Sequence, residues 1–156
     1  MSRRGFERWL ASTSNRVFVV FPIALSAIEA ALARGVPSVN AWALPLLAWG
    51  YLQYKLAGRY RLREGGGGPG LEVPPKRLVT EGPYRYMRNP MYLGHLIFLC
   101  GLAIFFRSWI GAALFAYHVV WFHRRVLRDE ARLVRIFGDD YRAYAARVKR
   151  WMPGRR

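Results

Sequence analysis

The sequence predicts an all-helical polytopic membrane protein with about four transmembrane helices. Three observations predict this fold class. The chain of 156 residues is 53% hydrophobic, its apolar residues gather in four long runs, and its 25 lysines and arginines lie mainly between those runs. Because the length suits one domain, we expect a single membrane domain over residues 1–156.

The four apolar runs predict membrane spans at about 17–34, 39–56, 91–106 and 109–123. Each run lies near the lower end of the roughly 17–25 residues that a helix needs to cross a bilayer. Any one of them would also suit a buried helix of a soluble domain. Four in succession, separated by basic segments, are difficult to pack into such a domain.

The basic residues predict the orientation of these spans. All of them except Arg34 and Arg107 lie before the first run, from residue 55 to the third run, or after the fourth run. Such alternation follows the positive-inside rule. It predicts cytoplasmic termini, a cytoplasmic loop over 57–90 and a cytoplasmic C-terminal region over 124–156. We expect an integral protein of a bacterial inner membrane.

Composition excludes several other classes of protein. The net charge of +16 suggests a nucleic-acid partner, but a nucleic-acid-binding protein has no reason to alternate its cations with long apolar runs. We therefore expect membrane lipids as partners and no nucleic acid. An apolar and aromatic content this high is not typical of disorder. Cys100 has no partner for a disulfide.

Glycine punctuates the cytoplasmic parts of the chain. The run Gly65–Gly68 lacks the preceding strand and the following Lys-Ser/Thr of a phosphate-binding loop, so we expect a flexible linker. The fourth apolar run continues without a breaker, which predicts one helix from Trp109 to Phe137 that extends into the cytoplasm. Gly138 is expected to end it. A short final helix would then carry Tyr141, Tyr144 and Val148.

Two cytoplasmic clusters have residues suited to binding. Residues 76–94 contain the turn signals Gly82-Pro83 and Asn89-Pro90 beside a predicted helix start. This cluster fits either a cradle for a small ligand or an interfacial loop anchored by Tyr and Arg at the headgroups. The second cluster holds Arg125, Asp129 and Glu130. Arg125 and Asp129 share a helix face, so they form either an ordinary surface ion pair or an acidic site for a cationic ligand.

Both clusters also resemble a known family. Residues 78–94 read Leu-Val-Thr-Glu-Gly-Pro-Tyr-Arg-Tyr-Met-Arg-Asn-Pro-Met-Tyr-Leu-Gly, and residues 129–144 read Asp-Glu-Ala-Arg-Leu-Val-Arg-Ile-Phe-Gly-Asp-Asp-Tyr-Arg-Ala-Tyr. The two segments resemble the signature of the isoprenylcysteine carboxyl methyltransferases and their phospholipid methyltransferase relatives. Val148, Arg150 and Pro153 follow in register. The resemblance covers about residues 76–153.

The resemblance implies a membrane methyltransferase that uses S-adenosylmethionine without a Rossmann fold and releases S-adenosylhomocysteine. Its acceptor would be a lipid or a lipidated small molecule, methylated on a prenylcysteine-like carboxylate. A phospholipid amine and a thiol are alternative acceptors, and a non-enzymatic membrane scaffold or transporter subunit is the alternative of another class. The oligomeric state is not predicted.

The resemblance also implies which residues form the site. Arg125 is expected to hold the substrate, and Glu130 is expected to accept a proton if the acceptor is an amine. The implied cofactor-binding residues are Lys76, Arg77, Leu78, Val79, Tyr84, Asn89, Pro90, Met91, Tyr92 and Asp129. No metal is expected, because His95, His118 and His123 lack a ligating spacing.

Two positions depart from the pattern of the family. Asn89 stands where the family usually has a histidine, so no imidazole can titrate there. Asp129 replaces a glutamate, which keeps the charge but shortens its reach by one methylene.

Overall fold

The computed structural model describes residues 3–33, 38–68 and 73–154, and all regular secondary structure within those ranges is helical. The all-helical part of the predicted fold class is confirmed. The chain divides into two compact units. Unit 1 comprises residues 1–51 and 95–118, and unit 2 comprises residues 52–94 and 119–156.

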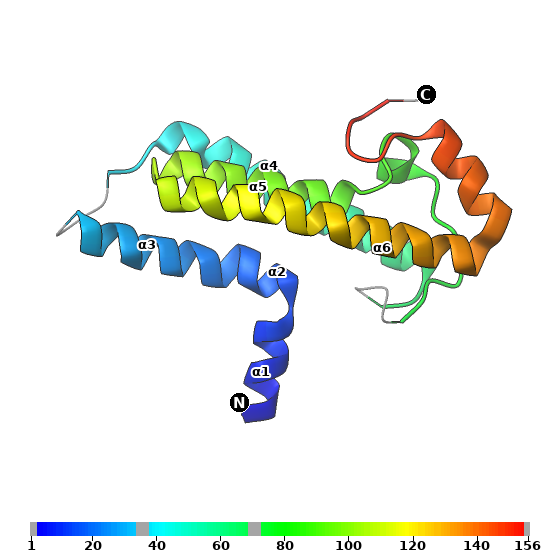
Figure 1. Ribbon diagram of the computed structural model, residues 1–156, viewed down its shortest axis with the longest axis horizontal. Coiled ribbons are helices and arrows are strands. Elements are labelled where there is room, and N and C mark those ends of the chain that lie inside the picture. Colours follow the sequence, from blue (N-terminus) through cyan, green and yellow to red (C-terminus); the bar gives the residue numbers. More distant parts are fainter. Residues whose placement is uncertain (1–2, 34–37, 69–72, 155–156) are drawn as a thin grey trace. The chain divides into compact units, whose positions relative to one another are not determined.

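Unit 1 begins with a run of helices that is interrupted twice. Helix α1 (Arg3–Ala11) ends before Ser12, whose extended ψ of 120° separates it from α2 (Thr13–Asn15). Figure 1 shows α1 turning away from the helices that follow. The π-helical turn η1 (Arg16–Val20) then leads into α3 (Phe21–Leu32). Pro22 in the first turn of α3 has no N–H to donate, which accounts for the local change in helical pitch.

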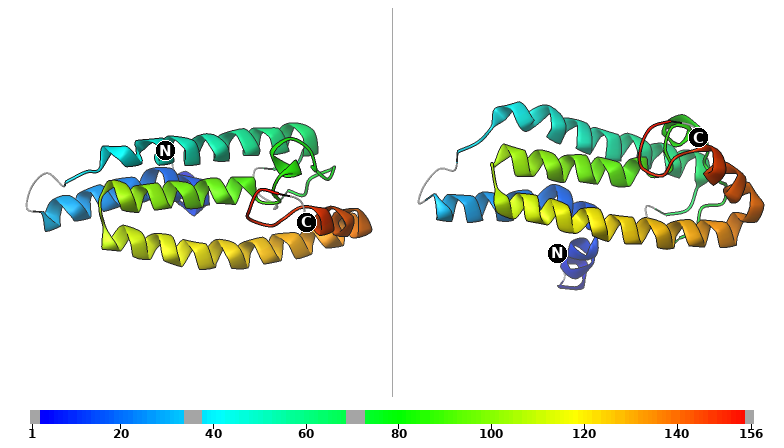
Figure 2. Two further views of the ribbon diagram at one scale, coloured as in Figure 1. Left: turned by 90° about the horizontal axis from the view of Figure 1, so that it is seen from above. Right: turned by 45° about the horizontal axis from the view of Figure 1, so that its top comes forward.

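The rest of unit 1 contains a tight helical hairpin. Turn η2 (Ala41–Ala43) precedes α4 (Leu44–Gly65), and α5 (Pro90–Phe105) precedes α6 (Trp109–Arg147). The helices α5 and α6 lie side by side in both views of Figure 2. A Cβ on Gly111 would lie 2.9 Å from the Cα of Ala103, so glycine permits this close approach.

Four helices contribute to the core of unit 1. Leu25 from α3, Leu102 and Phe106 at the end of α5, and their partly buried neighbours pack together. These neighbours are Phe21, Leu47, Phe98, Phe105 and Leu114. Large apolar side chains nevertheless remain exposed on the same unit, Trp42 and Trp109 at 90% each. Apolar side chains of this size and exposure are typical of contact with lipid or with another apolar surface.

Within the described residues, one helical stretch is both long and apolar enough to cross a membrane, Thr13–Leu32. Helix α5 is apolar but has only 16 residues. The predicted number of four spans is therefore not confirmed. Helix α4 shows why the count is difficult, since it continues past residue 56 and takes Lys55, Arg59 and Arg61 into its second half. The end of the first predicted span, at residue 34, lies outside the described residues.

Unit 2 contains the ends of these helices and the loop between α4 and α5. Helix α6 is helical from Trp109 through Phe137, has a break at Gly138 (φ 55°, ψ −126°), and then continues to Arg147. The predicted break is confirmed, and Tyr141 and Tyr144 lie on the segment after it. Val148 lies just beyond the helix, although we expected it inside.

The glycine run begins at the end of α4 and contacts residues that follow it in the loop. Gly65 is the last residue of α4, and its carbonyl accepts hydrogen bonds from the amides of Lys76 (2.8 Å) and Arg77 (3.2 Å). Gly67 has φ 78°, and a Cβ there would lie 2.6 Å from the Pro74 carbonyl oxygen. Gly65 and Gly67 therefore lie where another part of the chain passes too close for a side chain.

Gly82 anchors the short helical turn η3 (Gly82–Arg85) that precedes α5. Its φ is 59°, and a Cβ there would lie 2.5 Å from the Cζ atom of Tyr60 on α4. Only glycine can combine this conformation with contact to the ring. The Gly82-Pro83 turn signal therefore corresponds to a packing contact with α4.

We predict that Gly82→Ala destabilises the protein by about 2–5 kcal/mol, because backbone strain and the overlap with Tyr60 add. The matched control is Gly138→Ala. Gly138 has φ 55° but nothing within 4 Å of its Cβ position, so strain alone should cost about 1–3 kcal/mol. Thermal unfolding of the detergent-purified variants measures both. An equal loss in the two variants would show that the contact with Tyr60 contributes nothing.

Candidate functional site

The loop before α5 is held against the end of α6 by two buried tyrosines. The hydroxyl of Tyr144 donates to the carbonyl oxygen of Tyr84 at 2.7 Å. Burial raises the pKa of both phenols above the ordinary tyrosine value. Both hydroxyls therefore stay protonated at neutral pH, and the donor that fixes η3 is retained.

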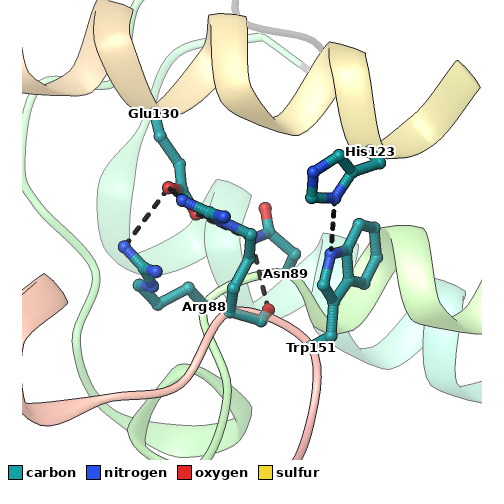
Figure 3. A network of polar contacts seen from close by, with 6 residues as sticks. Arg88, Asn89, His123, Glu130 and Trp151 are labelled. Carbon is teal, nitrogen blue, oxygen red and sulfur yellow. Dashed lines mark hydrogen bonds and ion pairs between the residues drawn. The ribbon is translucent and has the colours of Figure 1, made fainter. Parts of the chain in front are cut away.

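Glu130 on α6 is the centre of the largest polar network in unit 2. Its carboxylate accepts a hydrogen bond from Nη2 of Arg150 at 2.9 Å and lies 3.3 Å from Nη1 of Arg88. Nε of Arg150 donates to both carboxylate oxygens, at 3.2 and 3.1 Å. Figure 3 shows Glu130 pointing from α6 toward Arg88 and Asn89 on the loop. One carboxylate thus joins α6, the loop and the C-terminal segment.

The charges of this network are largely removed from water. The side chains of Arg88 and Glu130 are 7% and 11% exposed, and that of Arg150 is 32% exposed. A buried carboxylate keeps its charge only if close cations compensate its desolvation. The hydrogen bond from Arg150 to Glu130 also raises the pKa of Arg150, so this guanidinium keeps its charge.

Asn89 belongs to the same network. Its Nδ2 donates to Oε1 of Glu130 at 3.2 Å and to the carbonyl oxygen of Arg150 at 3.3 Å. An amide carries two donors on one nitrogen and does not titrate near neutrality. The residue that departs from the family pattern therefore links α6 to the C-terminal segment at any physiological pH.

A second polar group joins α5 and α6 through Tyr92. Its hydroxyl donates to Oδ2 of Asp129 at 2.5 Å and accepts from Nε of Arg125 at 3.1 Å. The Arg125 and Asp129 side chains are 3.8 Å apart, which confirms the predicted i,i+4 pair. Arg125 also lies over the ring of Trp121 at 5.5 Å, and Tyr92 packs on Phe122 at 5.3 Å. The result is a half-buried carboxylate bordered by aromatic rings.

The remaining predicted residues lie on other contacts of unit 2. Lys76 and Arg77 are exposed, and their amides bind Gly65. Leu78 packs on the cluster of Tyr141, Tyr144 and Val148, while Val79 contacts Gly65. The contacts of these four residues place them along the end of α4 and the C-terminal helix.

Pro90 and Met91 form the start of α5. Pro90 is fully buried, and its carbonyl oxygen accepts from Nε2 of Gln53 on α4 at 3.0 Å. The Met91 side chain reaches Gly58, where a Cβ would lie 3.4 Å from its Cε. These two residues therefore fix where α5 begins relative to α4.

Sequence reasoning did not predict the contacts of the C-terminal segment. Nε1 of Trp151 donates to Nδ1 of His123 on α6 at 3.3 Å, and the two rings stack with centroids 6.5 Å apart. Figure 3 shows this pair beside the Glu130 network. The pairing joins residues far apart in the sequence, so no spacing rule could have indicated it.

The comparison with protein families finds a similarity over this part of the chain. The phospholipid methyltransferase family model matches residues 69–140. This range includes the loop, the start of α5 and most of α6. Residues 69–140 are thus similar to the phospholipid methyltransferase family.

Curated relatives carry more specific names. The chain is 37% identical over 78 residues to a protein-S-isoprenylcysteine O-methyltransferase of Schizosaccharomyces pombe, covering 49% of this chain and 33% of the relative. It is 42% identical over 79 residues to protein-S-isoprenylcysteine O-methyltransferase B of Arabidopsis thaliana, covering 49% and 40%. It is 32% identical over 88 residues to methanethiol S-methyltransferase 1 of Bradyrhizobium diazoefficiens, covering 56% and 30%. The match thus spans less than half the length of each of these relatives.

We predict that Glu130→Gln destabilises the protein by about 3–5 kcal/mol, because Arg88 and Arg150 would lose the charge that compensates their burial. Asp139→Asn is the matched control. Asp139 pairs with Arg142 at 2.6 Å but is 93% exposed, so its loss should leave stability unchanged within error. Chemical denaturation measures both variants. Equal stability of the two would refute the role of the buried carboxylate.

We predict a loss of stability above pH 10 that Tyr141→Phe partly removes. Burial raises the pKa of Tyr141 from 10.0 to about 12. The folded state therefore holds this proton more tightly than the unfolded state, and its contribution is complete below pH 10 and lost as the pH rises toward 12. The free energy of unfolding, measured from pH 8 to 12, should fall less steeply in Tyr141→Phe. The exposed Tyr86→Phe should follow the wild type.

Proposed function

We propose that the protein is a membrane methyltransferase that transfers a methyl group from S-adenosylmethionine to a lipid-like acceptor of the prenylcysteine carboxylate type. The observation that carries the proposal is the contact of Tyr92 with both Asp129 and Arg125. The contact between Tyr92 and Asp129 joins the two sequence segments that resemble the family. The names of the relatives favour an enzyme over a scaffold or transporter subunit.

The residues around Asp129 suit a cationic ligand. S-adenosylmethionine, when bound, supplies a methyl group activated by a positively charged sulfur, and it shares a positively charged α-ammonium group with S-adenosylhomocysteine. The Asp129 carboxylate is 20% exposed, and Tyr92 beside it packs on the ring of Phe122. Carboxylates and aromatic faces both attract cations. We infer that Asp129 and Tyr92 bind the cofactor, with Asn89, Pro90 and Met91 at the start of α5 and Tyr84 before it.

The chain segment at residues 76–79 is the proposed adenosine side. Its exposed Lys76 and Arg77 and its partly buried Leu78 and Val79 are arranged by the return of the chain along α4. Such a segment offers apolar contact and polar backbone groups to a nucleoside. The assignment rests on the family resemblance together with this arrangement.

Methyl transfer is an in-line displacement, so the protein has mainly to align two reactants and keep water away. An acceptor carboxylate or thiolate needs no proton removed. Arg125, which Tyr92 and Asp129 orient, can hold such an anion by a charge-assisted hydrogen bond. We therefore propose Arg125 as the substrate-binding residue.

Glu130 fits a positioning role better than the proton-accepting role that we expected. Its two carboxylate oxygens are engaged by Arg150, Arg88 and Asn89, and its side chain is 11% exposed. A base needs an accessible lone pair. This arrangement disfavours a protonated amine as acceptor and supports a carboxylate.

A thiol acceptor is the second candidate. The relative with the longest alignment among those described is named a methanethiol S-methyltransferase, and a thiolate shares the negative charge of a carboxylate. For either acceptor we propose a membrane location with both termini cytoplasmic. The exposed apolar side chains of unit 1 and the stretch Thr13–Leu32 support the membrane location, and the distribution of the basic residues supports the orientation.

Calorimetric titration of detergent-purified protein with S-adenosylhomocysteine tests the proposal. We expect binding by the wild type, and a loss of about tenfold or more in affinity for Asp129→Ala, the size of one charged contact. Tyr92→Ala should weaken binding similarly. Asp139→Ala, which removes an exposed carboxylate of the same helix, should bind as the wild type.

Absence of binding by the wild type would refute the proposed function. Unchanged binding by both Asp129→Ala and Tyr92→Ala would refute the site but not the activity. A labelled methyl donor offered with prenylcysteine analogues, small thiols or amine lipids then identifies the acceptor. Methylation of amine lipids alone would exclude the proposed acceptor class.

A further inference from the structure

The segment Lys149–Gly154 follows the last helix and contacts both the loop before α5 and helix α6. The family model matches residues 69–140, so this segment follows the matched residues, although Arg150 and Pro153 are in register with the family signature that the sequence resembles. The amide of Arg88 donates to the Lys149 carbonyl oxygen at 3.0 Å, and the amide of Gly154 donates to the Tyr86 carbonyl oxygen at 3.0 Å. The segment therefore pairs with the loop immediately before α5.

Arg150 gives this segment its connection to α6. Two of its nitrogens bind the Glu130 carboxylate, and its carbonyl oxygen accepts from Nδ2 of Asn89. Asn89 and Glu130 are thus both held by one residue. A bidentate guanidinium fixes the direction of a carboxylate as well as its charge, which a lysine does only in part.

Trp151 adds an independent attachment. Its indole N–H donates to His123 on α6, two residues before Arg125. The rings of Trp151 and His123 are stacked, with an interplanar angle of 27°. This attachment lies in a more exposed place than the Glu130 network.

We propose that Lys149–Gly154 is an integral part of the methyltransferase site, in which Arg150 is a positioning residue for Asn89 and Glu130 and Trp151 fastens the segment to α6. The proposal rests on the proposed function. The Arg150 guanidinium acts on the ligand through Glu130, whose Oε1 accepts from Nδ2 of Asn89, two residues before Met91 and three before Tyr92. Loss of the guanidinium should release the Glu130 carboxylate, loosen this turn and misplace the cofactor-binding residues at the start of α5.

The test compares Arg150→Met, Arg150→Lys and Trp151→Phe with the matched control Arg147→Met. Arg147 is exposed, and its Nε donates only to a carbonyl oxygen of its own helix, that of Ala143. Calorimetry measures S-adenosylhomocysteine affinity well below the unfolding temperature of each variant. Hydrogen exchange of the peptide over residues 84–89 measures attachment of the loop without any ligand.

We expect Arg150→Met to weaken binding by about tenfold, because it removes the two-nitrogen contact that orients Glu130, with faster exchange in the loop. Arg150→Lys should restore part of the affinity, because it keeps the charge but not the two-pronged geometry. Trp151→Phe keeps a ring but lacks the donor, and should speed exchange with a smaller loss of affinity. Arg147→Met should match the wild type in both measurements.

Wild-type exchange and affinity in Arg150→Met would overturn the proposal. So would faster exchange with unchanged affinity, since the segment would then support the fold alone. If the wild type binds no S-adenosylhomocysteine, the proposed function fails and this inference fails with it, while the exchange data still report whether the segment holds the loop.

Discussion

The arrangement of unit 2 depends on one buried carboxylate. Glu130 lies on a helix, Arg88 on a loop that precedes another helix, and Arg150 on the segment after the last helix. A carboxylate removed from water requires cations nearby, and here each cation comes from a different part of the chain. The requirement to neutralise Glu130 therefore draws three segments together. Hydrophobic contact alone would not specify their register in this way.

Adjacent acids on α6 serve different purposes for a geometric reason. Consecutive helical residues point about 100° apart, so Asp129 and Glu130 face different neighbours. Glu130 faces the loop and the C-terminal segment, where arginines engage it from two sides. Asp129 faces Tyr92 and the aromatic residues of α5 and α6, and it keeps more exposure. Glu130 is therefore suited to hold the three segments together, and Asp129 is suited to contact with a cationic ligand.

The large positive charge of the chain also has more than one use. Most cations follow the predicted orientation in a membrane, and many are exposed on α4 and α6. Arg88, Arg125 and Arg150 instead compensate acids within unit 2. A guanidinium is suited to such positions because it keeps its charge and offers several donors in a plane. The net charge is thus the sum of a topological signal and a structural one.

The sequence by itself determined the helical class, the break at Gly138 and the pairing of Arg125 with Asp129, because these follow from local composition and helical periodicity. It also indicated the similarity to the phospholipid methyltransferase family, since two motifs occur in order. It did not determine where α4 ends, since the helix runs through the basic residues that we expected to end the span. Only the tertiary structure decided that Asn89 and Arg150 meet at Glu130 and that Trp151 meets His123. Those contacts join residues far apart in the chain, and their geometry depends on how the helices and loops pack.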